Sequence, residues 1–158
     1  MIQDILFTFL ISFSPFGEAR VGIPYGIEQG LLPSWVFIIG LSANLLVFPL
    51  FYKAIEFFNN HFLKHRWYRK AAIYLSLRAR RKTGPVVQKY GSIGLMIFVM
   101  IPLPFTGSYI GTIAAYIFGI DYKKSLIFIN SGVTISCFIV AFGWQYIAQL
   151  FELALNLF

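Results

Sequence analysis

Residues 14–30, SPFGEARVGIPYGIEQG, place Glu18 and Arg20 inside an otherwise apolar part of the chain and surround them with residues that break helices. These helix breakers are Pro15, Gly17, Gly22, Pro24, Gly26 and Gly30. In a bilayer, backbone that lacks its helical hydrogen bonds is tolerated only where it is buried in protein or lines a cavity. An ionisable residue at such a place indicates a functional site. We therefore expect residues 14–30 to form a broken hairpin that carries a binding site.

The amino-acid composition indicates whether this chain folds in water or in a membrane. Of its 158 residues, 58% are hydrophobic and only 12% are charged, and the mean hydropathy is +0.73. A soluble domain has about 25% charged residues and a smaller apolar share. We expect residues 1–158 to form a single all-α integral membrane domain that crosses the cell membrane more than once.

Positive charge is concentrated in one segment. The net charge is +7, residues 64–89 are rich in Lys and Arg, and no Asp or Glu occurs between Glu56 and Asp121. A nucleic-acid-binding loop is one interpretation, but apolar segments flank the run, and cytoplasmic loops between membrane spans carry the same excess. We expect residues 59–90 to be cytoplasmic and to contact membrane lipids rather than nucleic acid. Apolar residues at helical spacing predict a surface helix over 64–85, which Thr83, Gly84 and Pro85 end before a new helix begins.

The remaining sequence alternates between short and long apolar runs. As helices, residues 2–13 and 91–101 would rise at most about 18 Å, too little for a hydrocarbon core about 30 Å thick. Residues 33–58 and 125–152 are long enough to span that core. Asn44 lies about midway along the first span, where a hydrogen bond to a neighbouring helix is a better interpretation than a ligand contact.

The two halves of the chain share one order of elements. A second broken stretch, residues 101–119, follows the run at 91–101, and a shift of 89 residues aligns matching residue types. The aligned pairs are Pro15 with Pro104, Phe16 with Phe105, Gly22 with Gly111, Gly30 with Gly119 and Ser42 with Ser131. We expect an internal repeat, with repeat 1 at 1–58, a linker at 59–84 and repeat 2 at 85–158.

Each repeat is predicted to be a re-entrant helical hairpin followed by one transmembrane helix. Because each half then crosses the membrane once, the two halves must be inverted relative to each other. The basic residues fall on one face, which the positive-inside rule makes cytoplasmic, so both termini are expected outside. Two hairpin tips that come from opposite faces meet near the midplane, where inverted-repeat transporters build their substrate sites.

The motif GEARVGIPYGIEQG at 17–30, followed by LPFTGSYIGTIAAYIFG at 103–119, resembles the small multidrug export protein family, a group of compact prokaryotic membrane proteins. The resemblance covers essentially the whole chain. The chain is also similar, more distantly, to the DedA or VTT-domain superfamily, which pairs two re-entrant hairpins. That similarity implies proton-coupled movement of phosphate-bearing lipids, such as undecaprenyl phosphate or phospholipids. It also implies an arginine near the proline of the second hairpin, where this chain has Thr106, Ser108 and Tyr109 and no cation.

The chemistry of the expected site follows from Glu18 and Arg20. Arginine keeps its charge and offers a planar fork for phosphate or carboxylate, and a glutamate in a low-dielectric site can exchange protons. We expect an anion site with a coupling carboxylate; the alternative is a structural ion pair that locks the hairpins together. The expected substrate-binding or ion-binding residues are Glu18, Arg20, Thr106, Ser108, Tyr109 and Thr112. The residues assigned to hairpin geometry are Pro15, Gly17, Gly22, Pro24, Pro102, Pro104, Gly107 and Gly111.

Three classes of function compete for this chain. An enzyme would need a nucleophile, a metal set or an acid–base pair, to which only Glu18 contributes, so we expect no enzymatic activity and no metal or cofactor. A structural or assembly protein leaves the charged pair unexplained. We expect a transporter, coupled to an ion such as the proton, that moves or flips a small amphiphilic or phosphate-bearing lipid substrate; export of small hydrophobic drugs is a further alternative. Because two spans and two hairpins enclose little volume, we also expect a homodimer.

Overall fold

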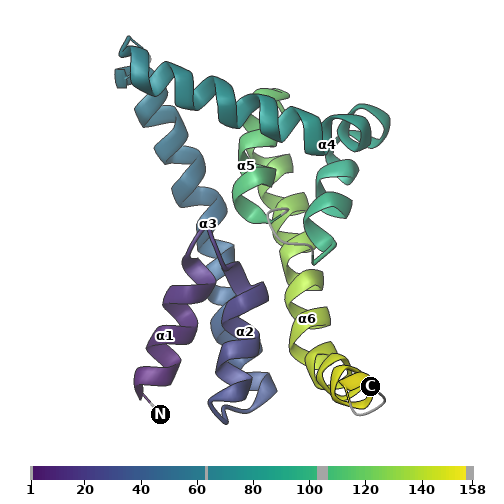
Figure 1. The fold of residues 1–158 in the computed structure, drawn as a ribbon. Coiled ribbons are helices and arrows are strands. Elements are labelled where there is room, and N and C mark those ends of the chain that lie inside the picture. The colour runs from purple at the N-terminus through teal and green to yellow at the C-terminus, as the bar shows by residue number, and fades with distance from the viewer. Residues whose placement is uncertain (1, 63, 103–106, 156–158) are drawn as a thin grey trace.

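A computed structural model describes residues 2–62, 64–102 and 107–155, and all the regular structure in these ranges is helical (Figure 1). The helices are α1 (Ile2–Phe13), α2 (Glu18–Glu28), α3 (Pro33–Phe62), α4 (Arg66–Met100), α5 (Ser108–Ile117) and α6 (Tyr122–Leu155). The expectation of an all-α fold is therefore confirmed for the described part of the chain. The predicted bounds of the first apolar run, 2–13, are those of α1, and the predicted start of the first span, Pro33, is the first residue of α3.

Within the described residues, two helices are long and apolar enough to cross a membrane. They are α3, with 30 residues, and the first 23 residues of α6, Tyr122–Trp144. In contrast, α1 and α5 have only 12 and 10 residues. At 1.5 Å per residue, a helix of such a length covers about half of a hydrocarbon core. The fold thus combines two candidate spans with helices that are too short to span a membrane on their own.

The two stretches expected to be broken are mostly helical. The structure keeps α2 continuous from Glu18 to Glu28 through Gly22 and Pro24, so the break is confined to residues 14–17 and to the turn after Glu28. The expectation for 14–30 was wrong over α2 because glycine here serves close packing. A Cβ added at Gly22 would lie 2.0 Å from Ser12 Oγ and 2.8 Å from Ser12 N. Likewise, α5 occupies 108–117 of the second stretch.

Helix α4 runs through its predicted end. Thr83, Gly84 and Pro85 lie inside α4, so the expectation that they end the linker was wrong. The bend comes later, at Gly91, where φ is 57° and ψ is −133°. Residues with a side chain rarely adopt this conformation, which makes glycine the suitable hinge residue. The bend divides α4 into an arm, residues 66–90, and a short terminal segment, residues 92–100.

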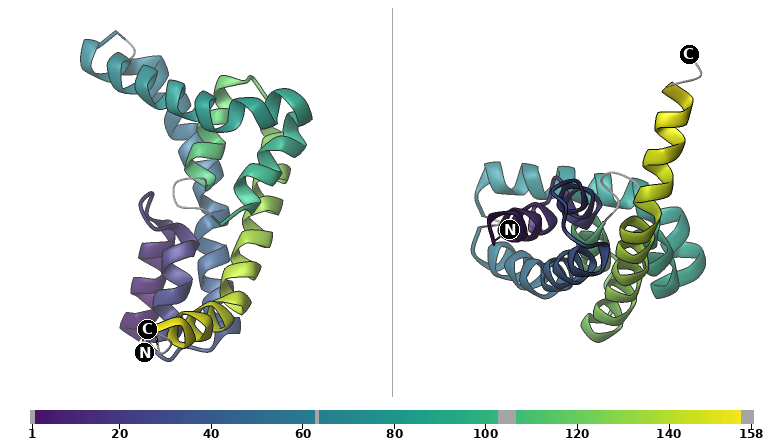
Figure 2. Two further views of the ribbon diagram at one scale, coloured as in Figure 1. Left: turned by 45° about the vertical axis from the view of Figure 1, so that its right-hand side comes forward. Right: turned by 90° about the horizontal axis from the view of Figure 1, so that it is seen from below.

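The short helices approach one another from opposite ends of the molecule (Figure 1). From the end that holds the N-terminus, α1 runs to mid-height and α2 returns. From the opposite end, the terminal segment of α4 runs to mid-height and α5 returns. Helices α3 and α6 run alongside both pairs in opposite directions, and the α4 arm lies across one end of the bundle (Figures 1 and 2). The basic arm and the chain termini therefore lie at opposite ends.

Several helix bounds in the two halves coincide after the shift of 89 residues, and the others differ by one or a few residues. Helix α2 ends at Glu28 and α5 at Ile117, and α3 begins at Pro33 and α6 at Tyr122. The shift moves the start of α1 from Ile2 to Gly91, the hinge of α4. The buried positions of the two long helices coincide as well. In α3 they are Val36, Gly40, Ala43, Asn44, Val47 and Phe48, and in α6 they include Ser125, Ile129, Gly132, Val133, Ser136 and Cys137.

The turns that end α2 and α5 have the same hydrogen bonds. Gly30 and Gly119 adopt positive φ values of 81° and 64°. The N–H of Leu31 donates to the carbonyl of Gly26 over 3.1 Å, and the N–H of Ile120 donates to that of Ala115 over 3.0 Å. This is the glycine-dependent arrangement that closes many helix C-termini. The local backbone is thus the same at equivalent positions of both halves.

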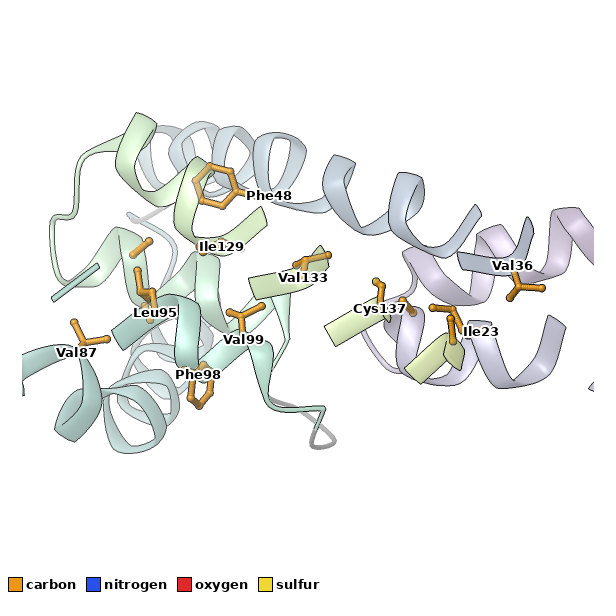
Figure 3. Packing of buried hydrophobic residues seen from close by; sticks show 14 residues of the cluster. Ile23, Val36, Phe48, Val87, Leu95, Phe98, Val99, Ile129, Val133 and Cys137 are labelled. Carbon is orange, nitrogen blue, oxygen red and sulfur yellow. The ribbon is translucent and has the colours of Figure 1, made fainter. Parts of the chain in front are cut away.

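The core joins the helices through apolar and small side chains (Figure 3). Ile23 of α2, Phe48 of α3, Leu95 of α4 and Ile129 of α6 are fully buried. Val99, at the end of α4, packs into the same cluster, where a Cβ added at Gly111 would lie 2.8 Å from its Cγ2. Close approach through glycine is typical of helix packing in membranes. It brings α5 against the end of α4 and against α6.

Candidate functional site at the junction of the short helices

The first contact between the halves is made by Glu18. Glu18 begins α2 with φ at 51°, in a region that non-glycine residues adopt at a cost of about 1–3 kcal/mol. Its side chain is directed at α5, because a Cβ added at Gly107 would lie 1.4 Å from Glu18 Oε2. Only glycine leaves room for the carboxylate at this position. Gly107 is the residue that the 89-residue shift pairs with Glu18.

The carboxylate of Glu18 caps a helix from the other half of the molecule. Gly107 precedes α5 and has no side chain with which to cap it. The backbone N–H of Tyr109 instead donates to Glu18 Oε1 over 3.4 Å. The N-terminus of a helix carries partial positive charge and unpaired N–H groups, so it stabilises a carboxylate. The second half thereby supplies part of the charge compensation for Glu18.

Arg20 forms the second contact. One guanidinium nitrogen lies 3.8 Å from Glu18 Oε2, with side-chain exposures of 12% and 11% for the pair. Its Nη2 donates to the backbone carbonyl of Val99 over 3.0 Å. Met100 ends α4, so the Val99 carbonyl is one of the last in that helix, where backbone acceptors remain unpaired. Arg20 therefore joins the carboxylate of its own helix to the end of α4.

Tyr109 makes the corresponding contact in the opposite direction. Its hydroxyl donates to the carbonyl of Phe13, the last residue of α1. The 89-residue shift pairs Tyr109 with Arg20. Each of the two residues thus extends its side chain from the second helix of one pair to a carbonyl near the end of the first helix of the other. This exchange fixes the two pairs of short helices against each other.

Asn44 connects three helices behind the charged pair. Its Nδ2 donates to the carbonyl of Ser12 in α1 over 3.0 Å, and its Oδ1 accepts from Ser108 Oγ of α5 over 3.3 Å. Asn44 itself lies in α3 and is 2% exposed. The expectation of a hydrogen bond between helices is confirmed. Thr112 Oγ1 donates to the carbonyl of Ser108 over 2.6 Å, so its hydroxyl satisfies the backbone of its own helix.

An open cleft of about 590 Å³ lies beside Glu18 and Arg20. Its charged and polar lining comes from Glu18, Arg20, Tyr109 and Arg78, a residue of the α4 arm. The rest of the lining is mainly apolar and comprises Pro15, Phe16, Gly17, Val21, Phe51, Leu75, Pro102, Gly107, Ile110 and Ile113. Cavities of this size with mostly apolar walls and a few polar groups bind small molecules.

A second, much smaller space of about 10 Å³ lies among buried polar groups near the same pair. Glu18, Arg20, Asn44, Ser108 and Ser136 line it. This is about the volume that holds one water molecule. The charged pair therefore contacts an open cleft and also a space of water size among hydroxyl and amide groups.

The predicted site residues divide into those that line the cleft and those that are buried away from it. Glu18, Arg20 and Tyr109 meet at the cleft, whereas Ser108 and Thr112 are fully buried and line no part of it. Their hydroxyls bond to Asn44 and to the backbone, so the structure does not place them where a substrate in the cleft would touch them. Thr106 and Pro104 lie outside the described residues.

The described residues that were assigned to hairpin geometry lie in turns or at close contacts between helices. Pro15 and Gly17 lie in the turn before α2, and Pro102 follows the end of α4. Gly22 and Gly111 allow close approach between helices, and Gly107 makes room for Glu18. Pro24 is buried within α2.

Sequence reasoning missed Arg78 and Phe51. Arg78 lies in the run that the positive-inside rule explains as a topological signal, and no local pattern separates it from its neighbours. Only the path of α4, which crosses the end of the bundle, brings it to the cleft.

Comparison with known protein families identifies the chain. A family model described as "Putative small multi-drug export protein" matches residues 18–139. The chain belongs to this family. The matched range begins at Glu18 and runs from α2 into α6, so it contains both Glu18 and Arg20 and the residues of α4 and α5 that they contact. Searches of the curated proteins and of the solved structures found no match. The family and the two apolar helices agree with a location in a membrane.

Proposed function

We propose that this member of the small multidrug export family is a membrane transporter whose substrate site is the cleft at the junction. The observation that carries the proposal is the position of Glu18 and Arg20. Their side chains are almost nine-tenths buried in an apolar helical protein, yet both line an open cleft of about 590 Å³. Buried charge in a membrane protein is costly, and it is typically associated with a substrate or ion path. The description of the family as export proteins agrees with this function.

The architecture belongs to the same proposal. The two pairs of short helices are re-entrant hairpins that dip into the membrane from opposite faces, and the halves are inverted repeats. Support comes from the coincident helix bounds, from the matching turns at Gly30 and Gly119, and from the exchange of contacts by Arg20 and Tyr109. In this arrangement the junction lies near the membrane midplane. Broken backbone at that depth is then buried in protein or faces the cleft, as a bilayer requires.

The orientation follows from charge. The arm of α4 carries most of the positive charge of the chain and lies at the end opposite the termini. The positive-inside rule makes the arm cytoplasmic and places both termini outside. Anionic headgroups of the inner leaflet then contact the arm, where each Lys or Arg contributes about 1 kcal/mol of attraction. Membrane lipids are therefore the first partners of this surface.

The charged pair suggests how substrate and ion are coupled. Arg20 already pairs with Glu18, so an anion in the cleft competes with the carboxylate for the guanidinium. Protonation of Glu18 at its carboxylate oxygen removes this competitor and leaves Arg20 to bind the anion. Release of the proton restores the internal pair and expels the anion. Binding of a proton to Glu18 and binding of an anion to Arg20 thus favour each other, which links the two movements.

One observation favours a structural role for the same pair. Glu18 and Arg20 each bond directly to the other half, to the Tyr109 N–H and the Val99 carbonyl. A protein that only assembles or holds membrane components would keep this pair as a lock between the hairpins. The lock does not account for the open cleft on which both side chains border. We therefore rank transport first.

The test is flux in proteoliposomes. A fluorescent short-chain phosphatidic acid, inorganic phosphate and ethidium serve as lipid, anion and cationic drug probes, with an internal pH dye to follow protons. We expect Glu18→Gln and Arg20→Gln to abolish transport of the moved probe, while Glu28→Gln and Arg81→Gln, both exposed and away from the cleft, retain it. Normal flux in both site variants, with unchanged helix content, would contradict the proposal. Transport of ethidium alone would assign drug export instead.

We also propose that two copies associate as a two-fold dimer. Two spans enclose little volume, and α6 exposes Phe138 and Phe142, at 56% and 42%, beside Phe37 of α3. Aromatic side chains on a helix face can pack against a second copy as well as against lipid. Cross-linking in native membranes is expected to give a dimer that Phe138→Ala weakens. Recovery of monomer alone would count against this assembly.

A further inference from the structure

An apolar groove extends from the cleft toward the arm of α4. It has a volume of about 460 Å³ and lies between α3, the α4 arm and α5. Its walls include Phe51, Ala54, Phe58, Ala72, Ile113 and Tyr116. Phe51, Leu75 and Ile113 line both the groove and the cleft, so the two spaces adjoin along these three side chains.

The charge at the cleft end of this space is positive. Arg20 and Arg78 line the cleft with one acidic residue, Glu18, whose carboxylate already accepts from Tyr109 N–H and pairs with Arg20. Arg78 also borders a surface depression of about 700 Å³ together with Arg80, Arg81 and Lys82. It thus belongs both to the basic surface and to the cleft. Guanidinium groups suit phosphate and carboxylate, and the excess of cations disfavours a cationic ligand.

We propose that the cleft and the adjoining groove together bind one anionic amphiphile, with its hydrocarbon part in the groove and its charged group between Arg20 and Arg78. The inference rests on the proposed function and specifies its substrate class. The α4 arm covers the groove on the basic side, so Arg78 meets the anionic group as the molecule leaves the leaflet on that face.

Photolabelling in nanodiscs of phosphatidylcholine, a zwitterionic lipid without net charge, tests the inference without a transport assay. The probes are a dodecyl chain with a terminal diazirine carrying a phosphate, a trimethylammonium or a neutral sugar headgroup. We expect the phosphate probe to label Phe58, Ala72 or Tyr116 about tenfold more than the other two, because only its headgroup accepts charge-assisted hydrogen bonds from the two arginines. Dodecyl phosphate should compete with this labelling, and inorganic phosphate alone should not at the same concentration.

Variants test separately the binding of the charged group at Arg78 and of the hydrocarbon part in the groove. Arg78→Gln should reduce labelling by the phosphate probe about tenfold and leave the sugar probe unchanged. Arg81→Gln is the matched control, because Arg81 borders the surface depression but not the cleft. Ala72→Trp should fill the groove and reduce labelling by the phosphate probe, and Leu46→Trp, at an exposed position of α3 outside the groove, should not. If Ala72→Trp does not fold, Arg78→Gln alone still decides the outcome.

Several outcomes would overturn the inference. Equal labelling by the three headgroups would mean that the groove holds ordinary lipid chains irrespective of charge. A preference for trimethylammonium would mean a cationic ligand, and equal losses in Arg78→Gln and Arg81→Gln would mean general attraction to the basic surface. Flux that depends on Glu18 and Arg20, without selective labelling, would contradict the ligand class inferred here and leave the proposed transport function standing. Selective labelling without such flux would support the ligand class and contradict the transport function.

Discussion

The pair α1 and α2 and the pair formed by the end of α4 and α5 have the same backbone plan but different chemistry. After a shift of 89 residues their helix bounds agree to within two residues, and both pairs end in the same glycine turn. The first pair carries Glu18 and Arg20 where the second carries Gly107 and Tyr109. The second pair binds these charged groups through its backbone: the Tyr109 N–H donates to Glu18, and the Val99 carbonyl accepts from Arg20. One half therefore supplies the ionised groups and the other supplies the dipoles that hold them.

The largest effect is expected from breaking the charged pair in one half. Arg20→Gln removes the cation 3.8 Å from Glu18 and leaves a buried carboxylate, which should cost about 3–5 kcal/mol of unfolding free energy. Glu18→Gln should cost less, because Arg20 keeps its bond to the Val99 carbonyl. The double variant should be more stable than the sum of the single losses predicts. Unfolding in mixed micelles measures all three, and strict additivity would show that the two side chains act independently.

Equivalent glycines should differ in their tolerance of a methyl group. A Cβ at Gly22 meets backbone atoms, Ser12 N and Thr8 O, both at 2.8 Å, and also Ser12 Oγ. The three atoms nearest to a Cβ at Gly111 all belong to side chains, and the nearest is Val99 Cγ2 at 2.8 Å. Because side chains yield more readily than backbone, Gly22→Ala should cost about 1–3 kcal/mol and Gly111→Ala less.

The matched control for both glycine variants is Gly143→Ala in α6, where nothing lies within 4 Å of the new methyl group. It should stabilise the protein by up to about 1 kcal/mol, the difference in helix propensity between glycine and alanine. Thermal unfolding in detergent compares the three variants. A larger loss for Gly111→Ala than for Gly22→Ala would mean that the second pair is the tighter one.

Asn44 and Val133 compare the two long helices at equivalent positions. Asn44→Val should lose the bonds to the Ser12 carbonyl and to Ser108, with a cost of about 1–2 kcal/mol. Val133→Asn places an amide at a buried position that is apolar in the present chain, and should cost about 1–3 kcal/mol. The measurement is the unfolding free energy of each single variant and of the double variant. A neutral Asn44→Val would show that the amide does not hold α1, α3 and α5 together.

The smallest effect is expected at the tyrosine that mirrors Arg20. Tyr109→Phe removes only the hydroxyl bond to the Phe13 carbonyl and should cost about 0.6 kcal/mol. Tyr90→Phe, at a half-exposed position of the α4 arm, is the control and should be neutral. Unfolding curves at matched detergent concentration resolve such a difference. A loss as large as that of Arg20→Gln would mean that the two halves contribute equally to the junction.

Much of the helical plan could be predicted from the sequence, because hydropathy and helix length are local properties. The runs that became α1 and α3 and the pairing of Gly30 with Gly119 needed only composition and spacing. The continuity of α2 through Gly22 and Pro24 could not be predicted in this way. A glycine that breaks a helix and a glycine that admits a neighbouring helix have the same local sequence. Only the contact with Ser12 separates the two.

The charged residues of the site could be predicted from the sequence, but the other residues that line the cleft could not. Glu18 and Arg20 stand out because ionised residues are rare among apolar ones. Ser108 and Thr112 have suitable hydroxyls, but helix rotation turns them toward Asn44 and the backbone. Arg78 is indistinguishable from its basic neighbours until the bend at Gly91 sets the course of α4. Properties that depend on the relative placement of distant helices are absent from local patterns.

The depth of the two turns in a bilayer is the most direct test of the account. Spin labels at Phe16→Cys and Ile101→Cys, both exposed positions beside the junction, can be compared with Leu32→Cys in the turn after α2, because the native thiol of Cys137 is buried. Collision with oxygen and with a water-soluble nickel complex reports the depth of each label. The account predicts that labels 16 and 101 both lie near the midplane and close together, with label 32 near the headgroups. Labels 16 and 101 at headgroup depth would contradict it.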